Sequence, residues 1–357
     1  MLKIGLLGFG TVGRSVAELL AERNCGIELL HILRRPGKAG GPLMTERFED
    51  IVNDPQVDVV VDVLSGIEPS HAYMLAALRA GKGVVTANKA ALAAHYEELA
   101  GTARALNLPL LFEASCGGGI PWIENIKKAS RIDRIDAMQG ILNGTGNYII
   151  DRMERFGMEF DDALKEAQAK GYAEADPTAD IGGFDVANKA LISASVAAGA
   201  PVCAHFPVLG IEKLSKAVLD DLHRAGKTVR HMMLFRRSHG RFALGVVPVV
   251  LPRTALEANV QENFNCATLT GDVVGTLKFY GQGAGGRPTA DAVLQDLTSI
   301  RTRRVEPVLE SAPLAYDAGL LRGTGFFPDG ILPDRTLEEL AAIAREKGAF
   351  MAFQPED

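Results

Sequence analysis

Near its start the chain reads Lys3-Ile4-Gly5-Leu6-Leu7-Gly8-Phe9-Gly10-Thr11-Val12-Gly13. The first part, Lys3–Leu7, is a short and largely apolar run, which is typical of a buried β-strand. Helical spacing of apolar side chains begins at Val12 and predicts a helix that ends near Arg23. A Gly-x-Gly-x-x-Gly pattern that stands between a strand and a helix indicates a fold that binds dinucleotides.

Each glycine of this pattern has a separate physical role. Gly8 permits the tight turn, Gly10 lets the main chain approach a pyrophosphate, and Gly13 lets the helix pack closely on the strand. Thr11 and Val12 open the helix, where unpaired N–H groups attract phosphate. We therefore expect these five residues to bind the cofactor. The alternative is a glycine-rich turn that holds no ligand.

Two arginines follow the second predicted strand, Ile27–Leu33. Sites for NAD usually place an acidic residue there, which holds the ribose 2′-hydroxyl. Arg34 and Arg35 instead suit a 2′-phosphate, because guanidinium groups form paired, charge-assisted bonds with it. The sequence thus favours NADP(H), with NAD(H) possible. The alternative is that one or both arginines are merely solvated.

The first third of the chain alternates between strands and helices, which predicts parallel βαβ units. Further strands are expected at Val57–Leu64, Val84–Thr86 and Leu108–Phe112, and further helices at Ser70–Ala80 and Ala91–Leu106. We expect a doubly wound α/β domain of the Rossmann type over residues 1–125, completed by part of residues 301–357.

The pattern changes after a boundary near Pro121–Lys127. A strand is expected at Ile132–Leu142, helices at Asp161–Lys170 and Val186–Ala198, and strands between Gly226 and Tyr280, notably Val246–Leu251 and Val273–Tyr280. Such blocks predict an α+β domain with an open sheet over residues 126–300. Beyond it we expect a helix at Leu337–Lys347 after Thr336, and disorder in the last residues.

Composition limits the classes of protein that the chain can belong to. Its 357 residues fit two domains, and 47% hydrophobic and 23% charged residues are ordinary for a globular protein. The net charge of -6 argues against a nucleic-acid partner. No stretch is long and apolar enough for a membrane span, and no signal peptide precedes Leu2. Four cysteines without a Cys-x-x-Cys pair predict reduced thiols in the cytoplasm: Cys25, Cys116, Cys203 and Cys266.

The most informative stretch runs from Gly171 to Lys189 and holds four carboxylates and a lysine. The acids are Glu174, Asp176, Asp180 and Asp185. Asp185 and Lys189 are four residues apart at a predicted helix start, so they share one helix face. Such a pocket suits a substrate with an ammonium group and offers a cationic proton donor to a carbonyl. The alternative is a surface ion pair beside ordinary turn residues.

This stretch resembles the signature of the homoserine dehydrogenase family. Four other segments resemble the same family in the same order: Val85–Lys89, Glu113–Pro121, Gly140–Tyr148 and Tyr280–Thr289. The resemblance extends from residue 1 to about residue 300. It implies reversible reduction of L-aspartate 4-semialdehyde to L-homoserine, in the biosynthesis of threonine and methionine.

The resemblance also implies roles for single residues. Lys189 matches the proton donor to the substrate carbonyl, and Lys89 matches a lysine near the nicotinamide; which of them transfers the proton stays open. Asp185 and Glu174, and with them Asp180, are expected to hold polar groups of the amino-acid substrate. Gly171 and Gly283 match main-chain positions that line the cofactor.

A monovalent cation, usually sodium, is a further feature that the resemblance implies. The matching positions are Glu113, Cys116, Gly118 and Ile120, and hard cations favour oxygen ligands such as main-chain carbonyls. The alternative is a tight turn without an ion. The resemblance also agrees with a homodimer through the second domain, since an open sheet usually needs covering.

The chain departs from the family pattern in three places. Gly146 stands where a larger residue is expected, and Ala312–Phe327 does not match the family text. About 55 residues follow Arg301, too few for the regulatory domain that many members carry, so we expect no feedback control of that kind. Three rival interpretations are another amino-acid dehydrogenase, a dinucleotide-binding sensor and a structural component of an oligomer.

Overall fold

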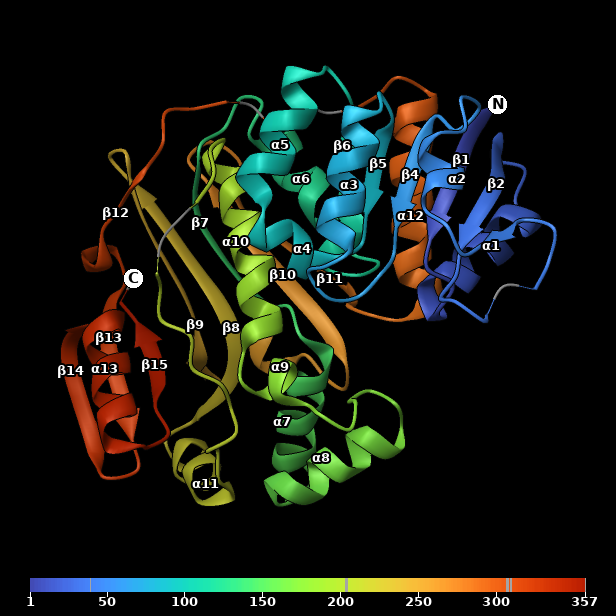
Figure 1. Ribbon diagram of the computed structural model, residues 1–357. Helices are drawn as coiled ribbons and strands as arrows, with labels where there is room; N and C mark the ends of the chain where they lie inside the picture. Colours follow the sequence, from blue (N-terminus) through green and yellow to red (C-terminus); the bar gives the residue numbers. More distant parts are fainter. Residues whose placement is uncertain (39, 203–204, 306–307, 309, 357) are drawn as a thin grey trace. The chain divides into compact units, whose positions relative to one another are not determined.

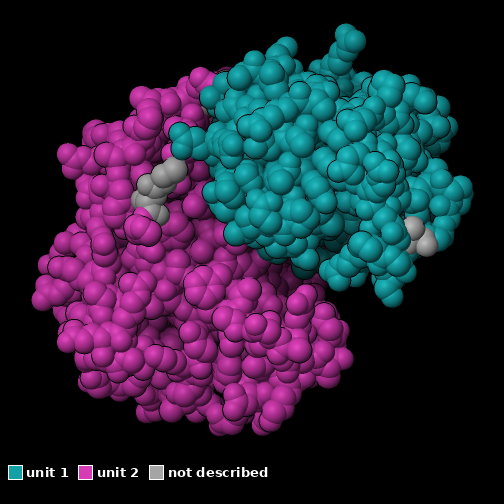
Figure 2. Space-filling view, viewed as in Figure 1, with its two compact units in different colours: residues 1–125, 284–308 teal, residues 126–283, 309–357 magenta. Residues whose placement is uncertain are grey.

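The computed structural model describes residues 1–38, 40–202, 205–305, 308 and 310–356. It divides into two compact units, shown in separate colours in Figure 2: Met1–Asn125 with Ala284–Val308, and Ile126–Gly283 with Leu309–Asp357. Residues 284–300, expected in the second domain, thus lie in the first unit. The reason is packing, because the helix in this segment buries its apolar side chains in the core of the first unit.

A six-stranded sheet forms the centre of the first unit, and all its strands are parallel. The strand order is β3-β2-β1-β4-β5-β6. Successive strands are added on one side of β1 as far as β3, and the next strand, β4, is added on the other side of β1. In doubly wound folds, dinucleotides bind at such a switch point, beside the carboxyl ends of the strands. The strands are β1 (Leu2–Leu7), β2 (Ile27–Leu33), β3 (Met44–Thr45), β4 (Val59–Asp62), β5 (Gly83–Thr86) and β6 (Leu110–Leu111).

Helices α1 and α12 pack against each other beside this sheet (Figure 1). Together with the sheet they bury one cluster of apolar side chains. Ile4, Val61, Val16 and Val293 meet in this core, so residues far apart in sequence close one hydrophobic layer. The helices of the unit are α1 (Thr11–Glu22), α2 (Glu49–Val52), α3 (Ser70–Arg79), α4 (Lys89–Ala94), α5 (Tyr96–Ala105), η1 (Glu113–Ser115) and α12 (Gly286–Arg301). The division between the units falls inside α6 (Trp122–Ala129).

The second unit contains a nine-stranded, mostly antiparallel sheet with open edges. Its path is β11-β10-β7-β8-β9-β15-β13-β14, and β12 pairs with β9 beside this path. The first five strands in chain order are β7 (Ile135–Ile141), β8 (Lys227–Ser238), β9 (Arg241–Pro252), β10 (Phe264–Gly271) and β11 (Gly275–Gln282). The two domains therefore have the expected α/β fold class, a Rossmann-type sheet and an open sheet.

Of the helices that lie between β7 and β8 in the chain, α7, α10 and α11 pack against strands of the second sheet. The helices of this part are α7 (Gly144–Phe156), α8 (Phe160–Ala169), α9 (Thr178–Ile181), α10 (Phe184–Ala198), α11 (Lys216–Arg224) and η2 (Glu257–Asn259). Neither α7 nor α11 is predicted from the sequence. Helix α7 begins with Gly144 and Gly146, and glycine disfavours a helix unless tertiary contacts hold it.

The end of the chain extends the second sheet, which corrects one expectation. The first unit includes the chain up to Val308, in agreement with the expected contribution of part of residues 301–357, but β15 (Ala352–Pro355) lies between β9 and β13 where disorder was expected. The other elements are β12 (Ala315–Tyr316), η3 (Ala318–Leu320), β13 (Arg322–Phe327), β14 (Gly330–Thr336) and α13 (Leu337–Lys347).

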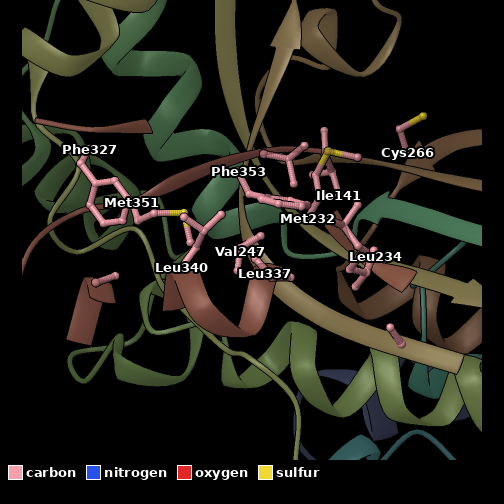
Figure 3. Packing of buried hydrophobic residues seen from close by; sticks show 14 of the residues in the cluster. Ile141, Met232, Leu234, Val247, Cys266, Phe327, Leu337, Leu340, Met351 and Phe353 are labelled. Carbon is pink, nitrogen blue, oxygen red and sulfur yellow. The ribbon is translucent and has the colours of Figure 1, made fainter. Parts of the chain in front are cut away.

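Burial of apolar side chains explains why the segment docks there. Leu337 and Leu340 of α13 and Phe353 of β15 lie in one cluster with Met232 and Val247 of the long strands (Figure 3). Burying a side chain of this size contributes about 1.5–3 kcal/mol. In the part of the chain that the structure describes, no helix is long and apolar enough to cross a membrane.

Candidate active site

The glycine turn after β1 has the backbone that a bound pyrophosphate requires. Gly8 has a φ of 101°, a conformation that side chains disfavour, and Gly10 stands at the N-cap of α1 with open space where a Cβ would point. At Gly13, a Cβ would collide with the main-chain oxygen of Gly8. The three glycines thus differ in what they do: Gly8 forms the turn, Gly10 leaves open space above the start of α1, and Gly13 makes a close packing contact. Thr11 and Val12 form the first turn of α1.

Of the two arginines after β2, only Arg34 is held at the glycine turn. Its guanidinium carbon lies 5.4 Å from the ring centre of Phe9, and Nη1 lies 3.8 Å from Sδ of Met44. Cation–π contacts of this kind keep a guanidinium in place while its N–H edge stays open to an anion. Arg35 is exposed at the start of the following turn.

The strands β4 and β5 end in a buried polar group that the sequence analysis missed. The Asp62 carboxylate accepts hydrogen bonds from Ser70 Oγ at 2.5 Å and Thr86 Oγ1 at 2.9 Å. Burial raises the pKa of Asp62, although these bonds oppose the shift. Asn88 caps α4 through Ala91, which places Lys89, half-buried, in the first turn of that helix.

The residues expected to hold a cation form a tight buried turn between β6 and α6. The Glu113 carboxylate accepts N–H bonds from Ile123 at 3.0 Å and Glu124 at 2.7 Å, so it caps the start of α6. Cys116 and Ile120 are buried, and both Gly117 and Gly118 have a positive φ. The donors that this turn offers are a carboxylate and main-chain oxygens, a set that suits a hard monovalent cation.

In the second unit, Lys189 and Asp185 form a buried ion pair on α10. Lys189 Nζ donates hydrogen bonds to Asp185 Oδ2 at 2.7 Å and to the Leu142 carbonyl at 2.6 Å. The relative exposures of the two side chains are 9% and 7%, so the pair is shielded from water. In such surroundings each charge depends on its partner, because an isolated buried ion is costly. The pair is therefore not the surface ion pair that the sequence left open.

A third residue, Asn143, connects this pair to Asp180, and the sequence analysis did not single it out. Its Nδ2 donates to Asp185 Oδ2 at 2.9 Å and to Asp180 Oδ1 at 2.7 Å, while its Oδ1 accepts the N–H of Gly146 at 2.7 Å. Asn143 is also the N-cap of α7. A signal was present, since asparagine is among the residues preferred at a helix N-cap.

The remaining predicted residues of this unit lie apart from that hydrogen-bonded group. Glu174 is exposed in the loop after α8, and within the described residues no hydrogen bond joins its carboxylate to Lys189. Gly171 follows α8 with a φ of 75° and open space around it. Gly283 follows β11 and is buried, and a Cβ there would collide with the Asn265 side chain.

His231 on β8 is another residue that was not predicted from the sequence. Its ring packs against Gly183, the N-cap of α10, and Nε2 lies 3.0 Å from the Leu209 carbonyl. Burial lowers the pKa of His231 to about 4, although the nearby Asp185 and the bond to Leu209 favour the charged form. The ring is therefore neutral near pH 7 and donates from Nε2, and it supports the turn from which Asp185 projects.

Comparison with known proteins identifies the class and then the family. Residues 8–113 match a family model for an NAD-binding domain, and with the strand order described above this defines a nicotinamide-dinucleotide-binding domain of the Rossmann type. That model is described as "Homoserine dehydrogenase, NAD binding domain", and residues 121–298 match one described as "Homoserine dehydrogenase". The chain belongs to the homoserine dehydrogenase family, and it is therefore an NAD(P)-dependent oxidoreductase acting on a CH–OH group.

Individual relatives support this membership over nearly the whole chain. A homoserine dehydrogenase of Corynebacterium glutamicum is 39% identical, with 97% of this chain and 83% of the relative covered. One of Pseudomonas aeruginosa is 38% identical, with 91% and 78% covered. The crystal structure of a homoserine dehydrogenase from Thiobacillus denitrificans superposes with a TM-score of 0.89 at 31% identity, covering 99% of this chain and 98% of the other.

A fourth relative bears on the cofactor. The structure of a hyperthermophilic archaeal homoserine dehydrogenase in complex with NADPH is 27% identical and has a TM-score of 0.74, with 86% of this chain and 99% of that chain covered.

Proposed function

We propose that this protein reversibly reduces L-aspartate 4-semialdehyde to L-homoserine, with Lys189 as the proton donor. The observation that carries this proposal is the buried ammonium of Lys189, which two oxygen acceptors hold at 2.6 and 2.7 Å. An ammonium group that is fixed and shielded from water stabilises negative charge that develops on a nearby oxygen. Family membership supplies the substrate.

In this proposal, proton transfer from Lys189 accompanies hydride transfer to the substrate. A bound nicotinamide would supply the hydride that adds to the aldehyde carbon. The electron pair of the C=O double bond moves to the oxygen, which takes a proton from Lys189 Nζ. In the direction of oxidation, the neutral amine of Lys189 takes the hydroxyl proton back. Asp185 Oδ2 accepts a hydrogen bond from Lys189 Nζ and would hold this nitrogen in position between the two steps.

The carboxylates are proposed to bind the ammonium group of the substrate. Asp180 and Asp185 lie on one side of Asn143, which orients both through a single amide group. Glu174 stands in the exposed loop before them and is proposed to reach the substrate from there. Lys89 stays a second candidate for proton transfer, since it opens the helix after β5. Gly171 and Gly283 remain proposed main-chain contacts of the cofactor.

Oxidation of L-homoserine, followed at 340 nm, tests the assignment of the lysine. We expect Lys189→Ala to lower kcat by about 10²- to 10⁴-fold, the usual contribution of a general acid or base, with cofactor binding retained. Lys165→Ala is the matched control, because Lys165 is an exposed lysine paired with Asp162 on α8. If Lys89→Ala abolished turnover while Lys189→Ala kept it, Lys89 would be the donor instead.

We further propose a preference for NADP(H), held by the glycine turn and by Arg34, with Arg35 as a second contact. The support is the position of the Arg34 guanidinium over Phe9 of that turn. The absence of an acidic residue directly after β2 agrees with this preference, since Leu33 is followed by two arginines.

A sodium ion is proposed at the turn of Glu113, where main-chain oxygens of Cys116, Gly118 and Ile120 would complete its coordination. Such an ion would hold the turn that precedes α6 and would take no part in hydride or proton transfer. Replacing sodium by the bulky cation tetramethylammonium is then expected to lower both the activity and the melting temperature. If neither changed, the proposed sodium site would be contradicted.

A homodimer through the second unit is proposed as the working form. The support is an open sheet with a hollow on its surface, lined by polar side chains such as Gln139, Arg236, Thr268 and Lys278. Sedimentation is expected to give twice the mass of the chain. The location stays the cytoplasm in this proposal, since Cys25 and Cys266 are free thiols; Cys203 lies outside the described residues.

A further inference from the structure

Two histidines and a glutamate meet on the first unit, outside the site described above. Glu68 lies in the loop after β4, His71 in the first turns of α3, and His95 where α4 gives way to α5. One potential ligand atom of each lies within 4.8 Å of the others, and in the described part of the chain this is the single such group of three.

A fourth residue, Glu98, orients the central histidine. His71 Nδ1 lies 2.9 Å from Glu68 Oε1, and its Nε2 lies 2.9 Å from Glu98 Oε2. When a histidine binds a metal, its second ring nitrogen usually donates to a carboxylate, which fixes the tautomer and the direction of the ring. Glu98 already stands in that position for His71, whose side chain is only 13% exposed.

The second histidine is held close to the first. The rings of His71 and His95 stack with 3.6 Å between their centres and an angle of 9° between their planes. Nδ1 of His95 also lies 4.0 Å from Glu98 Oε2. Two adjacent imidazoles would repel each other if both were charged, so this arrangement suits a state in which a bound cation replaces their protons.

We propose that Glu68, His71 and His95 form a binding site for a divalent transition-metal ion of the Zn²⁺ type. Two imidazole nitrogens and one carboxylate oxygen are the ligands that Zn²⁺ takes in sites that keep a fourth position for water. Tetrahedral bonds of about 2.0–2.1 Å would place the ligand atoms about 3.3 Å apart. His71 Nδ1 and Glu68 Oε1, at 2.9 Å, would then separate slightly, whereas atoms near the 4.8 Å limit of the group would approach one another. Rotation of the partly exposed His95 and Glu68 side chains supplies this movement.

A bound metal ion would connect two segments of the first unit, one after β4 and the other after β5. Glu68 and His71 follow β4, whereas His95 follows β5, and both strands end at the edge where the dinucleotide is expected. A metal ion held by both would stabilise the folded unit, since it binds the unfolded chain less well. We expect the ion to stabilise the fold of the first unit, because its ligands follow two different strands, and to take no part in proton or hydride transfer.

Titration of the purified, chelator-treated full-length protein with Zn²⁺ tests the site, by calorimetry and by the visible absorption of Co²⁺ as a substitute ion. We expect one ion per chain and a rise in melting temperature. His71→Ala and His95→Ala are each expected to abolish this binding, and Glu98→Gln to weaken it by about tenfold, as loss of an outer-shell partner does.

The matched control is His31→Ala, because His31 in the same unit pairs with a single carboxylate, Asp54, at 2.7 Å. It is expected to bind Zn²⁺ as the wild type does. If His71→Ala fails to fold, the exposed Glu68→Gln gives the same test with less disturbance. Absence of stoichiometric binding to the wild type, or binding that survives both His71→Ala and His95→Ala, would overturn the proposal.

Discussion

Asn143 shows how much of the site depends on one neutral side chain. It orients two carboxylates with its amide nitrogen and caps α7 with its amide oxygen. The two carboxylates repel each other, and the amide donor that they share offsets part of this repulsion and holds Asp180 beside the Asp185–Lys189 pair. The same residue therefore contributes to stability and to the proposed catalysis.

Replacement of Asn143 should separate these two contributions. We expect Asn143→Ala to lower kcat for homoserine oxidation by at least tenfold, because Asp180 and Asp185 lose their common donor. Loss of the cap should also lower the free energy of unfolding by about 1 kcal/mol. Steady-state kinetics and urea unfolding measure the two effects.

Thr336→Ala is the control for the capping effect, because Thr336 caps α13 in the second unit through a capping box with Glu339. It should lose a similar amount of stability and keep its kcat. Equal kcat values for the two variants would show that Asn143 is only a cap.

Arg34 provides a second test at the scale of the residue. We expect Arg34→Ala to raise KM for NADP⁺ about tenfold, a loss of about 1.4 kcal/mol, and to leave KM for NAD⁺ nearly unchanged. The reason is that only NADP⁺ carries the 2′-phosphate that the guanidinium would bind. Arg47→Ala is a suitable control, since Arg47 is exposed beside Glu49 and Asp50. A parallel rise for both cofactors would contradict the proposed role.

At the scale of the element, the turn between β1 and α1 contains one glycine proposed to bind the cofactor and another that packs the helix on the strand. Gly10 faces open space, whereas Gly13 presses against the main chain of Gly8. A side chain at Gly10 would leave the fold intact but would occupy the space in which we propose that the pyrophosphate binds. A side chain at Gly13 forces helix and strand apart.

Two alanine variants test this division. We expect Gly10→Ala to keep the melting temperature and to weaken NADPH binding at least tenfold, and Gly13→Ala to lower the melting temperature by several degrees, as a loss of about 1–3 kcal/mol would. Differential scanning calorimetry and NADPH fluorescence measure these quantities. A Gly10→Ala variant that binds NADPH normally would show that the pyrophosphate lies elsewhere.

At the scale of the whole molecule, the end of the chain completes the second sheet. Segment 310–356 supplies β12 to β15 and α13, and Phe353 pairs in register with Val249. The core of this unit thus joins side chains that are more than a hundred residues apart in the chain, such as Met232 and Phe353. Cooperative unfolding of the unit is the expected consequence.

The stability of the whole molecule at acid pH depends on the buried side chain of His231. His231 is neutral in the folded protein, because burial lowers its pKa to about 4, whereas its ordinary value is 6.5. Between pH 6.5 and pH 4, His231 is therefore protonated in the unfolded chain but not in the folded chain. Its contribution to the free energy of unfolding is fully present above pH 6.5 and is lost as the pH falls toward 4. The loss is on the order of 3 kcal/mol.

We expect His231→Gln to flatten the fall in unfolding free energy between pH 7 and pH 4, relative to the wild type. Glutamine keeps a donor for the Leu209 carbonyl but takes up no proton. Urea unfolding across this pH range measures the effect, and His205→Gln, at an exposed position, controls for loss of a histidine. Identical slopes for wild type and His231→Gln would contradict the assignment.

The sequence predicted those parts of the molecule that depend on local order along the chain. Helix α13 has the predicted bounds, because Thr336 and Glu339 form its capping box from adjacent positions. Strand β2 and the glycine turn were likewise predicted, since apolar runs and glycines act through their immediate neighbours. The Asp185–Lys189 pair was predicted from its spacing of four residues on one helix.

Tertiary structure alone decided which distant groups meet. Asn143 reaches Asp185 across 42 residues, and the Leu142 carbonyl reaches Lys189 across 47. It also decided that α7 forms despite its glycines and that the chain end pairs with β9. Local patterns do not contain this information, because a hydrogen bond or a strand pairing between distant segments is stable only after the surrounding apolar core has brought them together and excluded water.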